Sequence, residues 1–404
     1  MKKKDFDIVI VGGGMVGAAL ACALGDSSLK VAVLEAKEPD YNWKTEHDIR
    51  VSAITHASQR IFQNLNVWQQ MLDEGACSYH EMSVWDMTGD GQIHFDSAEV
   101  GAEDLGHIIE NRIIQKALQQ RLIDFDNIEF LYPFQSQQLH FDSDGVQIID
   151  SNNNIIHANL IVGADGANSW VRKQANIELN SWDYEQTAVV AVVKTSESHR
   201  NTCWQQFMPT GPLAFLPLQQ NYSAIVWSTS PQHAEFLTSL SEQKFNEELQ
   251  LTFGSVLGRI SIVSDKAGFP LRLRHAKQYI QNNLALIGDA AHTVHPLAGQ
   301  GVNLGLLDAA ALAEVLLEAN NKHKNMGSFS VLRKYERQRK GGNVSMLAAM
   351  DMFKRLFSND NLFLKGVRNF GLKMAGNSST ARSFFIKQAL GDNQELPKLA
   401  KYLS

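Results

Sequence analysis

The hydrophobic and polar positions of the chain form short apolar runs separated by glycine-rich turns, and the first such unit lies near the start. The β-branched run at residues 8–11 (IVIV) predicts a buried strand. Three glycines follow, and the small apolar residues up to Gly25 then predict a helix. The run KVAVLE, which ends at Glu35, resumes as a second strand. The segment therefore predicts a strand-helix-strand unit.

The glycines of this first turn have a spacing that suits a dinucleotide. Gly12, Gly14 and Gly17 form the pattern GxGxxG. The first permits the turn, the second lets backbone N–H groups approach a pyrophosphate, and the third lets the helix lie close to the strand. Packing alone also produces such turns, but Glu35 lies 18 residues after Gly17, where a carboxylate binds a ribose 2′-hydroxyl and disfavours a 2′-phosphate. FAD or NAD is therefore favoured over NADP.

A second apolar run, LIVG, closes at Gly163 and is followed by Asp165 and Gly166. An apolar strand that ends in such a turn is typical of a ligand-binding edge, but it is equally typical of an ordinary strand end. The residues alone leave both interpretations open.

A third apolar run, LALIG, ends at Gly288–Asp289, where a carboxylate can bind a ribitol or ribose hydroxyl. The chain then passes Pro296 and several glycines into an Ala- and Leu-rich helix, whose first N–H groups, at 301–303, can face electron-rich ligand atoms. Glycines here keep side chains away from a flat ring lying on the backbone. His292 and His295 have no third ligand nearby, so we expect loop residues at the flavin edge and no metal site.

Composition and charge narrow the class of protein. With 44% hydrophobic and 20% charged residues in 404, the chain is typical of a soluble globular protein, and its net charge of −6 disfavours nucleic acid as a partner. The start, MKKK followed by an apolar run, resembles a secretory signal or membrane span, but the glycines and the second strand favour a soluble domain. The three cysteines lie far apart, so neither a disulfide framework nor a zinc site is expected and a reducing compartment fits best.

Together these motifs resemble a known family. GxGxxG near the start, GADGANS in the middle and GDAAHTVHPLAGQGVNLG late in the chain are similar to single-component FAD-dependent aromatic hydroxylases, the group that contains para-hydroxybenzoate hydroxylase. HPLAGQGVNLGLLD resembles the signature of the ubiquinone-biosynthesis hydroxylases. RVSAITHAS, YHEMSVWD, LGHIIEN, LAFLPL and YERQRK look most like the polyprenylphenol 5-hydroxylase branch. The resemblance covers nearly the whole chain.

The resemblance implies FAD contacts in all three motifs. The residues concerned are Gly12, Gly14, Gly17, Glu35, Arg50, Asn111, Asp165, Gly166, Asp289, Gly299, Gln300, Gly301, Val302 and Asn303. The first four would hold the ADP half, Arg50 the pyrophosphate or the flavin side, and Asp289 the ribitol side, while residues 299–303 would lie against the isoalloxazine. Arg112 departs from the small polar residue of close relatives, and its role stays open.

If three separated motifs contact one FAD, the cofactor domain must be discontinuous. We predict an α/β fold with a Rossmann-like FAD-binding domain made of residues 1–75, 101–177 and 277–340. The runs TAVVAVVKT, PLAFLPL and YSAIVWSTS, with one helical run at 241–258, predict an antiparallel-sheet substrate domain made of residues 76–100 and 178–276.

The C-terminal region, residues 341–404, is predicted to be helical and differs in charge from the rest. It holds nine Lys or Arg and four Asp or Glu, a net charge of +5, whereas the preceding residues carry −11. A basic amphipathic surface suits anionic lipid or a partner, and a helical hairpin closing the back of the protein is an equal alternative. We expect a cytoplasmic protein with peripheral contact on the inner face of the membrane.

The resemblance implies that an external donor reduces FAD, that O₂ is captured as a flavin C4a-hydroperoxide, and that oxygen passes to C5 of a polyprenylphenol. The cofactor carries this chemistry, so no catalytic side chain is predicted. Only one GxGxxG occurs, so NAD(P)H binds transiently or another reductase replaces it. We also expect a homo-oligomer and association with a multi-enzyme ubiquinone-biosynthesis complex.

The substrate wall is the least specific part of the prediction. We assign Phe215, Pro217 and Trp227 to it, with Pro296 at the flavin edge, although each is equally typical of a core. Three alternatives remain: the same chemistry at another ring position, hydroxylation of a soluble phenol, and a non-enzymatic flavin-bound scaffold of a biosynthetic complex.

Overall fold

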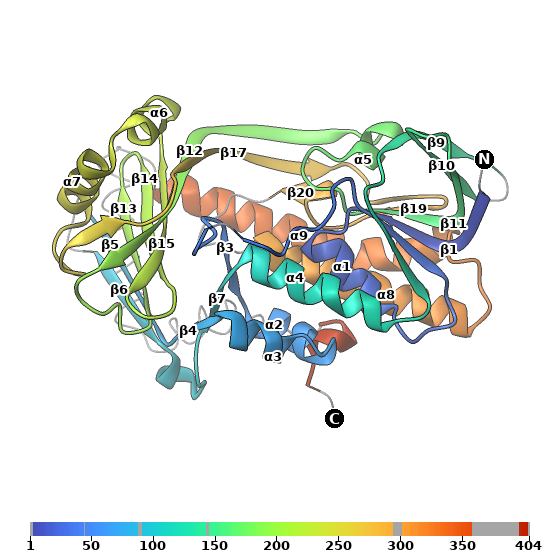
Figure 1. The fold of residues 1–404 in the computed structure, drawn as a ribbon, viewed down its shortest axis with the longest axis horizontal. Coiled ribbons are helices and arrows are strands. Elements are labelled where there is room, and N and C mark those ends of the chain that lie inside the picture. Colours follow the sequence, from blue (N-terminus) through green and yellow to red (C-terminus); the bar gives the residue numbers. More distant parts are fainter. Residues whose placement is uncertain are drawn as a thin grey trace.

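A computed structural model describes residues 3–43, 45–87, 91–142, 145–293, 301–357 and 396–402. The fold has two parts, joined along one side by the long strands β12 (Leu179–Thr195) and β17 (Ala267–Ala276) (Figure 1). One part is an α/β unit around a mostly parallel sheet, and the other is an antiparallel sheet covered by helices. The predicted α/β fold class is thereby confirmed.

The first sheet contains the predicted strand-helix-strand unit. Strand β1 runs parallel to both β2 and β11, and β11 runs parallel to β19, so that the three predicted apolar runs lie side by side. The sheet order is β18-β19-β11-β1-β2-β8, and β10 and β9 extend it from β11. Its strands are β1 Lys3–Val11, β2 Val31–Leu34, β8 Ile128–Leu131, β9 Ser136–Phe141, β10 Val146–Asp150, β11 Ile155–Gly163, β18 Ile280–Gln281 and β19 Leu284–Leu286.

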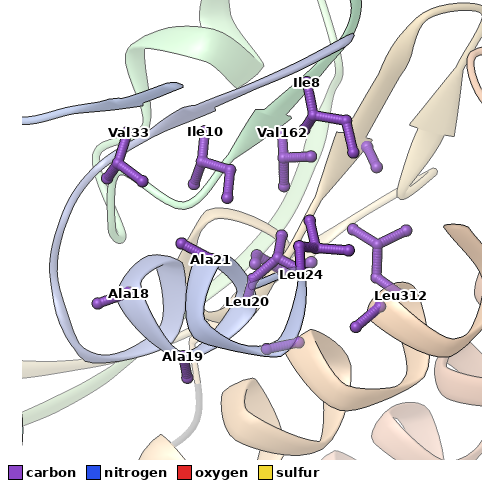
Figure 2. Packing of buried hydrophobic residues seen from close by; sticks show 14 of the residues in the cluster. Ile8, Ile10, Ala18, Ala19, Leu20, Ala21, Leu24, Val33, Val162 and Leu312 are labelled. Carbon is purple, nitrogen blue, oxygen red and sulfur yellow. The ribbon is translucent and has the colours of Figure 1, made fainter. Parts of the chain in front are cut away.

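Helices with small side chains cover one face of this sheet. Figure 2 shows Ile8 and Ile10 of β1 and Val162 of β11 directed toward the alanines of α1 (Met15–Ala23) and toward Leu312 of α8 (Gly301–Asn321). Alanine on the helices lets backbone and sheet approach closely, and all of these side chains are buried. α4 (Asn111–Arg121), α5 (Trp170–Gln174) and α9 (Phe329–Phe357) complete this part.

The second sheet has the order β20-β17-β12-β15-β14-β13-β5-β6, and β16 pairs with β12. Every pairing is antiparallel except β13 with β5. The strands not yet given are β5 Glu81–Asp86, β6 Gln92–Asp96, β13 Thr202–Met208, β14 Gly211–Pro217, β15 Tyr222–Thr229, β16 Ile260–Ile262 and β20 His292–Thr293. Two helices cover it, α6 (Pro231–Ser239) and α7 (Glu242–Phe253), where one helical run was expected. Ser230 caps α6 and Pro231 opens it, a start signal that was present in the sequence.

A small third sheet lies between the two parts. It consists of β3 (Val51–Ile54), β7 (Gly106–Glu110) and β4 (Cys77–Tyr79), in that order. α2 (His56–Asn64) and α3 (Trp68–Glu74) follow β3. The short 3-10 helices are η1 Ser97–Val100, η2 Leu122–Asp124, η3 Gly288–Ala290 and η5 Lys398–Ala400.

The C-terminal segment 396–402 returns to the α/β part and packs on α2. The buried side chain of Arg60 donates from Nε to the Ala400 carbonyl over 2.8 Å, and Asn64 donates to the Leu399 carbonyl over 2.8 Å. α9 continues to Phe357, so the start of the predicted C-terminal region is helical, whereas residues 358–395 lie outside the described residues.

The second sheet has two distinct faces. The outer face packs against α6 and α7; its side chains are Val189, Ala191, Val193, Leu213, Phe215, Ile225 and Trp227. The inner face is turned toward Ala53 of β3 and Ile108 of β7; its side chains include Ala188, Val190, Val192, Ala214, Leu216, Ala224 and Val226.

This arrangement corrects the predicted substrate wall. Phe215 is 0% exposed and lies 4.0 Å, ring to ring, from Phe253 of α7, and Trp227 is 2% exposed in the same core. Pro217 is buried on the same side of β14. Strand alternation identified residues that share a face, but the outer face is the one that the helices fill. These side chains stabilise the sheet and do not form a wall toward the α/β part.

Replacing Phe215 with Ala is expected to lower the free energy of unfolding by about 3–5 kcal/mol, because the cavity would open in a closed core. Chemical denaturation measures this loss, and Phe215→Leu, which keeps most of the volume, serves as the control. A fully stable Phe215→Ala protein with altered substrate binding would contradict the assignment to the core.

Candidate functional site

The glycine turn after β1 leaves backbone open where a pyrophosphate is expected. A Cβ on Gly12, which has φ +106°, would lie 2.5 Å from the Ala164 carbonyl oxygen, and a Cβ on Gly17 would lie 1.9 Å from the Gly12 oxygen. Both glycines are therefore required by close packing. Among the described residues, no atom lies within 4 Å of a Cβ on Gly14, and no side chain caps α1 there. The free N–H groups at this helix start fit a phosphate.

Glu35 lies at the end of β2 beside the same turn. Its Oε2 accepts from the Gly13 N–H over 2.9 Å, and its Oε1 accepts from the Lys37 N–H over 3.3 Å. These bonds orient the carboxylate at the edge of the glycine turn and leave acceptor positions on both oxygens. The geometry fits a carboxylate that receives ribose hydroxyls.

The Asp165–Gly166 turn after β11 touches the glycine turn and presents an acceptor without a partner. Asp165 Oδ2 accepts from the Trp170 N–H over 2.6 Å and from the Val171 N–H over 3.0 Å. Asp165 Oδ1 is buried and, within the described ranges of the chain, has no hydrogen-bond partner. Gly166 has φ +79° and open space at its Cβ position. Because buried acceptors are normally satisfied, Oδ1 fits a site for a ligand hydroxyl or bound water.

The third turn, residues 288–292, is held by Asp308 of α8, which is 0% exposed. One oxygen of Asp308 accepts from the Gly288 N–H over 3.1 Å and from His292 Nε2 over 2.5 Å. The other accepts from Arg339 Nε over 2.8 Å and from Asn343 Nδ2 over 3.1 Å, both in α9. Burial alone would raise the pKa of Asp308, but the charges of His292 and Arg339 outweigh it and lower the pKa to about 2. One ionised carboxylate therefore fixes both ends of the turn.

Asp289 lies in the middle of the turn that Asp308 holds. The Asp289 side chain has exposed surface, yet the surrounding protein desolvates it and raises its pKa, an effect that His292 and Arg274 partly offset. The carboxylate is therefore accessible on one side while protein groups surround it on the others. Within the described part of the chain it makes no side-chain hydrogen bond, so its oxygens are available to ligand hydroxyls.

The start of α8 closes the site from the other side. Gly301 has no atom of the described chain within 4 Å of its Cβ position, and Val302 packs on the main core. The side chain of Asn303 donates to the Ala53 carbonyl over 2.7 Å and accepts from the Thr55 N–H over 3.1 Å. The Asn303 side chain therefore connects α8 to β3. Pro296, Gly299 and Gln300 lie outside the described residues.

Arg112, whose role the sequence left open, holds the segment before Arg50. Its guanidinium donates to Glu110 over 2.6 Å and to the Thr45 carbonyl over 2.8 Å, and it lies 4.4 Å above the ring of Trp43. Arg50 is exposed, and its carbonyl oxygen accepts a hydrogen bond from the Asn111 N–H. The two predicted residues are therefore neighbours, Arg50 just before β3 and Asn111 at the start of α4.

Sequence reasoning assigned no role to two residues of this region and misplaced a third. Asp308 is the one charged residue in the apolar run GLLDAAALA, and a lone charge there was the available signal. The buried Arg172 joins two turns by donating to the carbonyls of Ala290 and Ala167 over 2.7 Å and 2.9 Å. His292, expected in a loop, lies in β20 and is 1% exposed. His295 lies outside the described residues.

The three turns, Glu35 and the start of α8 together fit FAD. The glycine turn offers free N–H groups to a pyrophosphate, Glu35 and Asp289 offer carboxylates to hydroxyls, and Asp165 Oδ1 is an open buried acceptor. Among the described residues no group of three His, Cys, Asp or Glu side chains forms a metal site.

We expect Asp308→Asn to weaken FAD binding, because the turn that carries Asp289 loses its anion. The dissociation constant should rise roughly tenfold or more, which corresponds to about 1.4 kcal/mol. Flavin fluorescence during titration of the apoprotein measures it. The matched control is Glu318→Gln on the exposed side of the same helix, which loses only its pairing with lysines and should keep its affinity. A folded Asp308→Asn protein that binds FAD with unchanged affinity would show that Asp308 is not needed to hold the turn for FAD binding.

Comparisons with known proteins place this site in a family. Residues 5–347 match the family described as FAD binding domain. The 3-demethoxyubiquinol 3-hydroxylase of Escherichia coli K12 is 38% identical over 97% of this chain and 100% of its own length. The mitochondrial ubiquinone biosynthesis monooxygenase COQ6 of Xenopus tropicalis is 38% identical over 91% of this chain and 89% of its own.

The fold is shared with solved structures of low sequence identity. The p-nitrophenol 4-monooxygenase PnpA of Pseudomonas putida has a TM-score of 0.79 at 18% identity, covering 96% of this chain and 99% of that one. Because the family model and relatives match along nearly the full length, the chain belongs to the FAD-binding domain family and, within it, to the ubiquinone-biosynthesis monooxygenases.

Proposed function

We propose that the chain is an FAD-dependent monooxygenase that hydroxylates the aromatic ring of a hydrophobic quinone precursor in ubiquinone biosynthesis. The observation that carries the proposal is the meeting of the three turns at one site in a chain that matches ubiquinone-biosynthesis hydroxylases along nearly its full length. When bound, FAD supplies the activation of O₂ and the transfer of one oxygen atom. The protein binds the cofactor and orients the ring against it.

The inner face of the second sheet is the proposed substrate wall. Ala53 links it to the cofactor site, because Ala53 packs against Ala214 and Leu216 and its carbonyl receives Asn303 at the start of α8. The face is apolar, and Val226 keeps exposed surface in the middle of a strand whose neighbours are buried. An apolar wall with accessible surface suits a phenol ring with a hydrocarbon tail.

Two ring positions are candidates for hydroxylation. The motifs that resemble the polyprenylphenol 5-hydroxylase branch favour C5. The E. coli relative is named for hydroxylation of a demethoxyubiquinol at position 3, which favours a later, partly substituted precursor. As electron donor we propose NAD(P)H bound transiently or a separate reductase, since the chain holds one GxGxxG.

The proposed location and partners of the protein follow from the hydrophobic substrate. A polyprenylated ring partitions into lipid, so we propose peripheral contact with the inner face of the membrane, association with a ubiquinone-biosynthesis complex, and a homo-oligomer. Among the described residues no helix is both long and apolar enough to cross a membrane. The basic composition of residues 341–404 supports contact with anionic lipid or a partner.

Deletion of the gene is expected to cause accumulation of a ring-deficient quinone precursor, identified by mass spectrometry. A plasmid copy should restore ubiquinone, and one with Asp289→Ala should not, because the third turn loses the carboxylate proposed to bind FAD hydroxyls. A precursor that lacks oxygen at C5 supports the first position, and an accumulated demethoxyubiquinol supports the second.

The same experiment separates the remaining alternatives. Rescue by the Asp289→Ala copy without bound flavin would indicate a scaffold. An unchanged quinone profile together with activity on small phenols would indicate a soluble-phenol hydroxylase. Either result would overturn the proposed function.

A further inference from the structure

Gln186 is a polar residue in the apolar inner face of the second sheet. It lies in β12 between Tyr184 and Ala188, which point inward and pack with Leu271 around Val226. A β-bulge between residues 183 and 186 precedes it, and Gln186 pairs with Leu271 of β17. The side chain is 8% exposed.

The amide of Gln186 is fixed in one orientation and has an open acceptor. Nε2 donates to the Thr210 carbonyl over 2.8 Å, and only the NH₂ group can make that bond, so Oε1 points the other way. Gly211 lets the amide approach, since a Cβ there would lie 2.9 Å from Nε2. Oε1 is buried and has no hydrogen-bond partner among the residues that the structure describes. A buried acceptor without a donor costs free energy, so a ligand donor at this point would be stabilising.

The distance between Gln186 and the cofactor turns leaves room for one aromatic ring. Along β17, Leu271 faces Gln186 and Arg274 pairs with Thr293, next to the turn that carries Asp289. Three residues of a strand span about 10 Å. A ring bound between these points can reach both the cofactor turns and the amide.

We propose that Gln186 Oε1 accepts a hydrogen bond from a ring hydroxyl of the substrate and thereby orients the ring. This inference rests on the proposed function. Gln186 is a specificity-determining residue: the apolar wall accepts the ring and tail, while the open acceptor of Gln186 selects a hydroxylated ring and fixes its rotation. A site that hydrogen-bonds a hydroxyl rejects an analogue lacking the donor, because the acceptor stays unpaired.

The test compares a short-chain prenylated phenol with its O-methyl ether. The wild-type flavoprotein should prefer the phenol in kcat/KM by roughly tenfold, equal to about 1.4 kcal/mol. Gln186→Met, similar in shape but without the acceptor, should lower the preference to near one. It should also divert more of the consumed O₂ to hydrogen peroxide, because the ring is no longer held in place.

Gln206→Met is the matched control. Gln206 is 7% exposed and its Oε1 also lacks a partner, but its backbone neighbour Leu213 and the flanking Met208 belong to the outer-face core. This variant should resemble Gln186→Met in stability and keep the wild-type preference. An unchanged preference in Gln186→Met, or equal losses in both variants, overturns the inference.

Binding distinguishes this inference from the proposed function. Titration of the oxidised flavoprotein with the phenol and the ether, followed by the flavin absorption spectrum, gives two dissociation constants without turnover. Tighter binding of the phenol that disappears in Gln186→Met supports the acceptor even if the wild type hydroxylates neither compound, a result that would refute the function alone. Equal binding of both compounds by the wild type overturns the inference.

Discussion

The buried carboxylate of Asp308 is the interaction on which the cofactor site depends. It lies inside an apolar helix, where an ion is unstable unless it is paired and fully hydrogen-bonded. Gly288 and His292 satisfy one oxygen, and two residues of α9 satisfy the other. The charge therefore ties together the turn after β19, the helix α8 and the helix α9. The bonds from Gly288 and His292 to one Asp308 oxygen lie on either side of Asp289. The position of Asp289 therefore depends on the paired charge of Asp308 in the core.

A second link, between Asn303 and β3, connects the cofactor side with the inner face of the antiparallel sheet. Asn303 binds the carbonyl of Ala53, and Ala53 packs on the inner face near Ala214. The same residue also receives the backbone of Thr55, where α2 begins, and α2 in turn holds the C-terminal segment through Arg60. Chain segments far apart in sequence thus converge at the start of α8, which explains why the proposed ring site and the cofactor site keep a defined relation.

The sequence pattern predicted the features that depend on residues close together in the chain. The glycine spacing follows from close contacts such as that between Gly17 and Gly12, and the parallel strands follow from continuous apolar runs. The inner and outer faces could not be assigned in this way, because alternation shows which residues share a face but not what covers it. Phe215 and Trp227 were placed on the wrong side for this reason. Asp308 was missed because its partners come from distant segments, and the docking of residues 396–402 left no periodic signal at all.

The two open acceptors, Asp165 Oδ1 and Gln186 Oε1, fit different ligands: the cofactor and the substrate ring. Asp165 Oδ1 lies among backbone turns that fit a polar cofactor, and Gln186 Oε1 lies in an apolar face that fits a ring. The first belongs to a surface of glycines and carboxylates, which binds many groups of one ligand. Gln186 Oε1 lies among apolar side chains. It therefore orients the ring on a surface that would otherwise bind any apolar molecule. Such a division is what a cofactor-dependent hydroxylation requires, because the chemistry resides in the cofactor and the protein must choose which ring atom meets it.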